Sequence, residues 1–168
     1  MGLQEYIWFG LSRVGRSLSA SIQAFRQEMS QQTNGYSKQA FSKGRQRIRP
    51  EAYSYLMEIC TDQFYQMAKP TLWNGYRVLA VDGSKINLPT SKETLLHFGY
   101  QSGSHEQVQG VASCLYDVLN HVFLDATLSP FVANERDLAE KHLEKLATIS
   151  KQEYLDLVLF DRGYPSAE

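Results

Sequence analysis

Two short apolar segments that lie far apart in the chain end in the same way, with an aspartate that a glycine follows closely. The first segment, 78–81, leads into Asp82-Gly83, and the second, 155–160, leads into Asp161 with a glycine two residues later. Apolar runs of this length indicate buried strands. A strand that carries a carboxylate at its end holds that carboxylate in a fixed place. The sequence therefore predicts a sheet in which two strands each present an aspartate.

The residues after the first aspartate predict a change of direction and a short helix. Gly83-Ser84 indicates a tight turn into a return strand at 86–89. A helix is predicted over 91–99, with Ser91 as its N-cap and Gly99 as its stop.

The next part of the chain predicts a hairpin and then a second helix. The strands 108–117 and 121–128 are expected to pair and to turn at Leu119-Asn120. A helix over 134–148 follows, and it leads into the strand that ends at Asp161. The resulting order is a strand, two or more antiparallel strands, a helix and a strand.

This order has a consequence for the two aspartates. A strand-helix-strand crossover joins parallel strands with right-handed sense, so the second strand can return beside the first. Asp82 and Asp161 would then lie within a few ångströms of each other and repel unless a cation sits between them. Carboxylate oxygens suit Mg²⁺ or Mn²⁺. The alternative is that both aspartates only cap strand ends in turns, where Asp-Gly is at home.

The N-terminal part of the chain is helical and locally basic. From Ser17, apolar residues recur at spacings of four, three and four up to Met29, which predicts one face of a helix. A polar turn with Asn34-Gly35 follows, and Ser37 is a plausible N-cap for the basic segment that runs to Pro50. A helix, a turn and a capped basic helix form the layout of a helix-turn-helix.

In that layout the second helix enters the major groove of DNA. Residues near its start would meet base edges, and the arginines behind them would meet phosphates. The alternative is a solvated basic helix that packs through Phe41 and Ile48. The expected DNA-binding residues are Lys38, Gln39, Ser42, Lys43, Arg45, Arg47 and Arg49, with Arg162 as a further phosphate contact.

A third helix after Pro50 should pack in the core through apolar residues from Tyr53 to Met67, and 69–75 should link it to the strands. The chain thus divides into a helical domain, 1–72, and an α/β domain, 73–168. A length of 168 residues allows one sizeable core and a small accessory domain. The net charge of −1 predicts no strong overall field, so any DNA binding must come from a local patch.

Cellular location follows from the cysteines and from the apolar runs. Cys60 and Cys114 have no zinc-ligand spacing and are expected to be buried thiols in a reducing compartment, although a disulfide stays open. No apolar run approaches the roughly 18 residues that span a bilayer. We expect a cytoplasmic protein without a membrane segment.

The two aspartate segments resemble a known family. Ala80–Ser84 with 86–89 is similar to the first-aspartate block of DDE transposases of the insertion-sequence 4 type, and Leu159–Ser166 is similar to their second-aspartate block. The segment Asn134–Asp137 resembles the residues that precede their crossover helix. The run Ser37–Lys43 resembles their N-terminal DNA-binding region.

The resemblance implies an RNase H-like mixed sheet with a crossover helix that cuts and joins DNA at transposon ends. Asp82 and Asp161 would be the catalytic metal ligands for Mg²⁺ or Mn²⁺. The third ligand of the family is a glutamate far downstream, and Glu168 follows the second aspartate too closely to be that residue. The chain is therefore expected to be the N-terminal part of a longer transposase and to be inactive in strand cleavage alone.

The resemblance also implies the partners. They are the double-stranded terminal repeats of a transposon and, in synapsis, a second copy of the protein, in a bacterial cytoplasm and at the nucleoid when DNA is bound. The alternative function is a non-catalytic DNA-binding product that competes with the intact transposase for the element ends.

Overall fold

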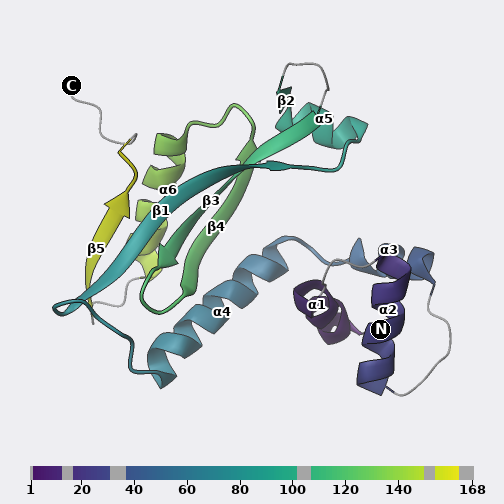
Figure 1. Ribbon diagram of the computed structural model, residues 1–168, viewed down its shortest axis with the longest axis horizontal. Helices are drawn as coiled ribbons and strands as arrows, with labels where there is room; N and C mark the ends of the chain where they lie inside the picture. The colour runs from purple at the N-terminus through teal and green to yellow at the C-terminus, as the bar shows by residue number, and fades with distance from the viewer. Residues whose placement is uncertain (1, 13–16, 31–36, 102–106, 150–153, 163–168) are drawn as a thin grey trace. The chain divides into compact units, whose positions relative to one another are not determined.

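A computed structural model of the 168-residue chain describes residues 2–12, 17–30, 37–101, 107–149 and 154–162 (Figure 1). The chain forms two compact units, Met1–Tyr53 and Ser54–Glu168. The boundary falls earlier than the change in sequence pattern at 72–73. Most of the helix α4 (Glu51–Met67) thus belongs to the same unit as the strands.

The first unit contains α1 (Leu3–Ser12), α2 (Leu18–Ser30) and α3 (Lys38–Arg45). The sequence did not predict α1, because its apolar residues lie all round the helix and give no single apolar face. Ring contacts dominate the core of this unit; for example, the rings of Phe9 and Phe41 have centroids 4.6 Å apart. The buried core residues are Tyr6, Phe9, Ile22, Phe25 and Phe41.

Helix α3 begins as predicted. The Ser37 side chain accepts a hydrogen bond of 3.1 Å from the backbone N–H of Ala40, which satisfies one of the free amides of the first turn. Phe41 is the buried residue of α3. The predicted turn at Asn34-Gly35 lies outside the described residues.

The second unit contains a mixed sheet, in which the strands β5, β1, β3 and β4 lie side by side and β2 pairs with the start of β3. β1 pairs in parallel with β5 and antiparallel with β3, and β3 pairs antiparallel with β4. The strands are β1 (Tyr76–Asn87), β2 (Tyr100–Gln101), β3 (Gln107–Asp117), β4 (Val122–Pro130) and β5 (Leu155–Phe160).

The predicted turn after the first aspartate is wrong. β1 continues through Asp82 and Gly83 to Asn87 as one strand of 12 residues. Its far half pairs with β3, from Asp82 opposite Cys114 to Asn87 opposite Gln109. A partner strand on one side is enough to keep Asp-Gly-Ser extended, although these residues favour turns in isolation.

Several other predictions for this unit are confirmed. The hairpin of β3 and β4 turns between Asp117 and Val122. The helix α5 (Lys92–Phe98) has Ser91 and Thr94 in a reciprocal capping box and Gly99 with a positive φ of 78° at its end. The helix α6 (Glu135–Ile149) is the predicted crossover, and its second residue donates its N–H to the Asn134 side chain.

The core of the second unit lies between α6 and one face of the sheet. The strands contribute Leu79, Val81, Leu115 and Leu124, and α6 contributes Ala139 and Leu146. Leu143, also on α6, is 39% exposed. Two polar residues, Asp117 and His142, are also fully buried.

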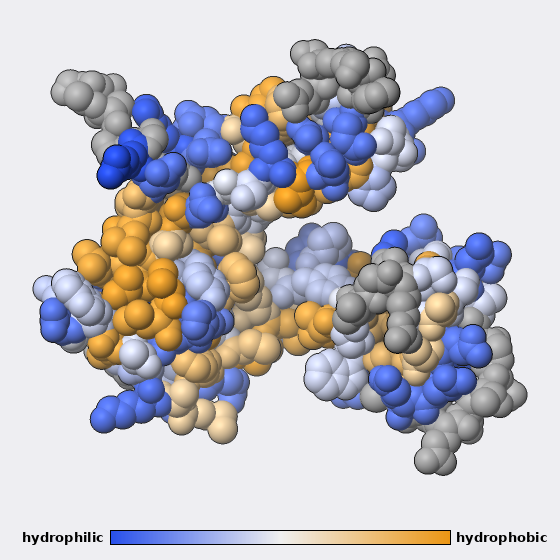
Figure 2. All heavy atoms as spheres, viewed as in Figure 1, coloured by the Kyte–Doolittle hydropathy of each residue, from blue (hydrophilic) through white to orange (hydrophobic). Residues whose placement is uncertain are grey.

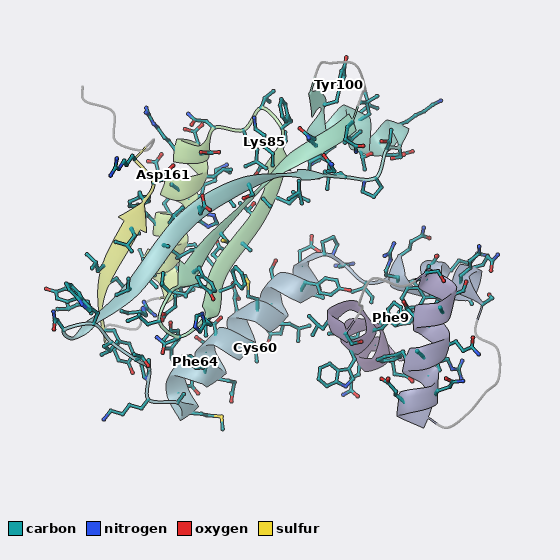
Figure 3. All side chains as sticks on the ribbon, in the orientation of Figure 1. Phe9, Cys60, Phe64, Lys85, Tyr100 and Asp161 are labelled. Carbon is teal, nitrogen blue, oxygen red and sulfur yellow. The ribbon has the colours of Figure 1, made fainter. Side chains whose placement is uncertain are left out.

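Helix α4 does not supply the apolar core face that its sequence predicts. Its buried residue is Thr61, whose hydroxyl donates to the backbone carbonyl of Phe123 at 2.9 Å. Met67 is 82% exposed, and Cys60 is exposed as well, as Figure 3 shows on α4. Cys60 and Cys114 are both free thiols. No described helix is long and apolar enough to span a membrane.

Candidate metal and DNA site

The parallel register of β1 and β5 places Asp82 and Asp161 at equivalent positions. The last register pair is Val81 opposite Phe160, and each aspartate is the next residue on its strand. Asp161 follows the end of β5 directly, where Figure 3 labels it. Neighbouring strands lie about 4.8 Å apart. The two carboxylates are therefore carried by adjacent backbones at the same level.

Both carboxylates belong to the face of the sheet that α6 does not cover. Side chains alternate along a strand, and Val81 points into the core beneath α6. Asp82 therefore points away from α6, and the same alternation applies to Asp161 next to its strand. Both side chains are exposed. Around them this face is apolar, with Leu155 65% and Leu159 45% exposed, and Figure 2 shows hydrophobic residues gathered over β5 and β1.

The local hydrogen bonds of the two aspartates are alike. Asp82 accepts the N–H of Gly83 at 2.8 Å, and Asp161 accepts the N–H of Arg162 at 2.5 Å, each through Oδ1. These bonds orient the carboxylates and leave each Oδ2 without a hydrogen-bond partner among the described residues. Two oriented carboxylates with open oxygens form a donor set that suits a hard divalent cation. Among the residues that the structure describes, however, no third histidine, cysteine or acidic residue joins them.

Cys114 is the neighbour of Asp82 across the strands. The two residues are register partners on β3 and β1, and the thiol is half-buried. Burial and the negative charge of Asp82 both raise the pKa of the Cys114 thiol. Cys114 is therefore held in its neutral form beside the carboxylates and does not add a negative charge to the site.

On the opposite face, a network that sequence analysis missed joins β5, β1, β3 and α4. Arg77 donates to both carboxylate oxygens of Asp156, at 2.7 and 2.9 Å. The guanidinium lies 4.9 Å from the centre of the Tyr65 ring, and the Tyr65 hydroxyl donates to Asp117 at 2.5 Å. Burial, which lowers the pKa of Arg77, is outweighed by the hydrogen bonds and charge of Asp156, so this pKa is raised. These contacts join residues that are far apart in the sequence, so local sequence patterns do not predict them.

A second buried cluster, also missed, joins α6 to β3 and β4. His142 Nδ1 lies 2.7 Å from Asp125 Oδ2, and its Nε2 lies 3.0 Å from Ser113 Oγ. These distances match those of a serine nucleophile with its base. Ser113 is only 3% exposed and His142 is fully buried, so no substrate reaches this hydroxyl. The cluster satisfies buried polar groups between helix and sheet.

The expected DNA-binding side chains lie on and just after α3. All of them except Ser42 are exposed, and Phe41 faces the core of the first unit. Gly44 lies directly against Tyr6: an added Cβ would lie 1.7 Å from the Tyr6 hydroxyl, so a side chain at this position would have to displace the Tyr6 ring. Helix α3 therefore keeps one face against α1 and presents its cations to solvent. Arg162 is exposed directly after Asp161.

Comparison with known proteins identifies a family for this unit. A family model described as the transposase DDE domain matches residues 73–168, which is more than half of the chain. No curated protein and no solved structure gives a significant match. The matched segment contains the whole β1–β5 sheet, and with it both Asp82 and Asp161.

Proposed function

The chain belongs to the transposase DDE domain family, and on this basis we propose that it takes part in metal-dependent DNA strand cleavage and transfer at transposon ends. The observation that supports this reaction is the register of β1 and β5, which brings Asp82 and Asp161 side by side. The fold we propose for this unit is RNase H-like, of the insertion-sequence 4 type.

In this proposal, Asp82 and Asp161 would hold Mg²⁺ or Mn²⁺, since each has an open carboxylate oxygen. Divalent ions at such a site activate the attacking oxygen and stabilise the leaving oxygen of a phosphodiester. The nucleophile is water in strand cleavage and a 3′-hydroxyl in strand transfer. The two carboxylates form an incomplete ligand set, so the reaction also needs a third ligand. Arg162, directly after Asp161, is positioned to contact a DNA phosphate.

The first unit supplies DNA binding in this proposal. Helix α3 acts as the second helix of a helix-turn-helix, with Lys38, Gln39, Ser42 and Lys43 toward base edges. The arginines at the end of α3 and beyond it contact phosphates. The exposure of these cations supports this role, as does the cap that fixes the start of α3. Synapsis of two transposon ends would bring two copies of the chain together.

Calorimetric titration with Mn²⁺ tests the metal site. We expect binding that Asp82→Asn and Asp161→Asn each weaken by about a hundredfold, because each removes one of two charged ligands. Glu140→Gln is the matched control, since Glu140 is an exposed carboxylate on α6. Equal Mn²⁺ affinity in all four proteins would reject the metal site.

A second function is favoured by one observation: the described residues contain no third metal ligand. In this alternative, the chain binds transposon ends without cleaving them and competes with an intact transposase. Both functions require binding to duplex DNA. A measurement of this binding in EDTA therefore distinguishes them from a protein that does not bind DNA at all. Each lost phosphate contact should reduce the salt slope of log K by about 0.9.

The DNA test uses Lys43→Ala and Arg45→Ala, with Lys92→Ala on α5 as the control. If the first two variants and the control have the same salt slope, α3 is not the DNA-binding element. Two results together would favour a DNA-binding protein without catalysis. Asp82→Asn would still bind DNA in EDTA, and Mn²⁺ would produce no DNA cleavage even when the third ligand is supplied.

A further inference from the structure

We propose that the ion pair between Arg77 and Asp156 sets the spacing of the two candidate metal ligands by locking the register of β5 against β1. This inference rests on the proposed function, because it assigns Arg77 and Asp156 as positioning residues for Asp82 and Asp161. Neither residue of the pair lies on the face that carries the aspartates, so they act through the strands.

The ion pair and the aspartates occupy matching places on the two strands. Arg77 and Asp156 are direct register partners, as are Val81 and Phe160, the residues just before Asp82 and Asp161. The ion pair therefore joins the two strands near their beginning, and the carboxylates lie at the other end of the same ladder. The side chains of Arg77 and Asp156 are 6% and 15% exposed, and both carboxylate oxygens are engaged.

The apolar residues of these strands specify their register only weakly. The segment 78–81 of β1 and the segment 157–160 of β5 are apolar at every position, on both faces. A slip by two residues keeps each side chain on its own face and replaces apolar contacts by other apolar contacts. Asp156 is the exception in β5. After such a slip, an apolar residue, Val158, would lie beside Arg77.

A slipped register would place a buried guanidinium without its carboxylate, which is strongly unfavourable. It would also separate the two candidate ligands. A shift of two residues moves Asp161 by about 6.6 Å along the strand relative to Asp82. A magnesium ion holds its oxygen ligands at about 2.1 Å, so two of its ligands lie at most about 4.2 Å apart. One ion could not be shared in the slipped register.

The surrounding contacts hold Arg77 itself in place. Its guanidinium lies against the Tyr65 ring, and Tyr65 is fixed by its hydrogen bond to Asp117 on β3. Asp117 is fully buried and accepts further bonds from the backbone N–H groups of Leu119 and Asn120. Arg77, against which β5 is aligned, is therefore held in place by contacts with α4 and β3 as well as by its own strand, β1.

Disulfide trapping measures the register directly. In a background with Cys60→Ser and Cys114→Ala, Ala80→Cys with Leu159→Cys marks the native register, because these two residues are partners. Val78→Cys with Leu159→Cys marks the register shifted by two residues in which Val158 lies beside Arg77. We expect only the first pair to cross-link in the otherwise unchanged chain, and both pairs to cross-link when Asp156→Asn is added.

Mn²⁺ affinity measures the consequence for the site. We expect Asp156→Asn to weaken Mn²⁺ binding by about tenfold if about nine-tenths of the molecules then adopt the shifted register, which cannot share an ion. Asp156→Glu keeps the charge and should restore most of the affinity. Arg77→Lys keeps a cation but loses the two-point contact, so its Mn²⁺ affinity should lie between those of Asp156→Asn and Asp156→Glu. Leu146→Ala is the control, because it destabilises the core without touching the ladder.

The outcomes separate this inference from the proposed function. The inference would be overturned if Asp156→Asn cross-links only in the native register and binds Mn²⁺ with unchanged affinity. It would also be overturned if Leu146→Ala lost as much Mn²⁺ affinity as Asp156→Asn. If Asp156→Asn does not fold, Arg77→Lys and Asp156→Glu decide by the same two readouts. If the unchanged chain shows no Mn²⁺ binding that depends on Asp82, the proposed function fails, and the cross-links still show whether the ion pair sets the register.

Discussion

On the face of the sheet that α6 covers, three aspartates are engaged by other side chains, whereas the two on the opposite face remain exposed. Asp117, Asp125 and Asp156 bind tyrosine, histidine and arginine partners. Among the residues that the structure describes, Asp82 and Asp161 accept only the next backbone N–H. Carboxylates whose oxygens are engaged within the protein hold the fold together, and those with an open oxygen are available to a cation.

The largest expected difference between the two faces concerns Asp117. It is fully buried and accepts bonds from Tyr65, Leu119 and Asn120. Asp117→Ala should lower the free energy of unfolding by about 3 kcal/mol, because several donors lose a fully buried acceptor. Asp82→Asn, on the exposed face, should change it by less than about 0.5 kcal/mol. Urea unfolding of both variants compares the faces; equal losses would contradict this division.

The next effect concerns the cluster around His142. His142→Leu removes the partner of both Asp125 and Ser113 and should cost about 2 kcal/mol. Because the three residues act together, adding Ser113→Ala to His142→Leu should cost less than the sum of the two single changes. A double-mutant cycle by urea unfolding measures this coupling. Strict additivity would show that Ser113 is not part of the cluster.

A smaller effect, with a defined pH dependence, concerns Tyr65. Burial, the hydrogen bond to Asp117 and its charge raise the pKa of Tyr65, so the folded protein favours the neutral phenol. Its contribution is fully present below the unfolded pKa of about 10 and is lost as the pH rises above that value. Tyr65→Phe should cost about 1 kcal/mol at pH 7.

The stability difference between Tyr65→Phe and the unchanged protein should then shrink above about pH 10. Thermal or urea unfolding at pH 7 and at several alkaline values measures it. Tyr55→Phe is a suitable control, because Tyr55 is 64% exposed on the same helix. A difference that is constant with pH would mean that the bond to Asp117 does not exist in solution.

The smallest effect tests the corrected strand. Gly83 has no positive φ, and an added Cβ would meet its nearest neighbour at 3.7 Å, which is ordinary contact. Gly83→Ala should therefore change the free energy of unfolding by no more than about 0.5–1 kcal/mol, in the stabilising direction. Gly99→Ala is the contrast, because Gly99 has a φ of 78° at the end of α5. A large loss of stability in Gly83→Ala would instead support the turn that the sequence predicts at Gly83-Ser84.

The sequence predicted those parts of the fold that local patterns encode. Capping residues and periodicity were sufficient for α3, α5 and α6, and the crossover rule was sufficient for the parallel pairing of β1 with β5. The turn at Gly83 was predicted wrongly because tertiary pairing with β3 overrides a local preference. Helix α1 was missed because a helix that is apolar on several sides has no amphipathic signal.

The candidate site was predicted only in part for the same reason. A repeated pattern of strand and aspartate identifies Asp82 and Asp161 without knowledge of the fold. The ion pair of Arg77 with Asp156 and the bond of Tyr65 to Asp117 join residues 79 and 52 positions apart. No local pattern reports such contacts, so the sequence alone assigned no role to these aspartates.

The most direct test of the metal site is a crystal structure of the chain soaked in Mn²⁺, with anomalous diffraction to locate the ion. The account predicts an ion between the carboxylates of Asp82 and Asp161, with oxygen ligands from both at about 2.1–2.2 Å. Two carboxylates on opposite faces of the sheet, or a manganese ion bound by neither of them, would contradict it.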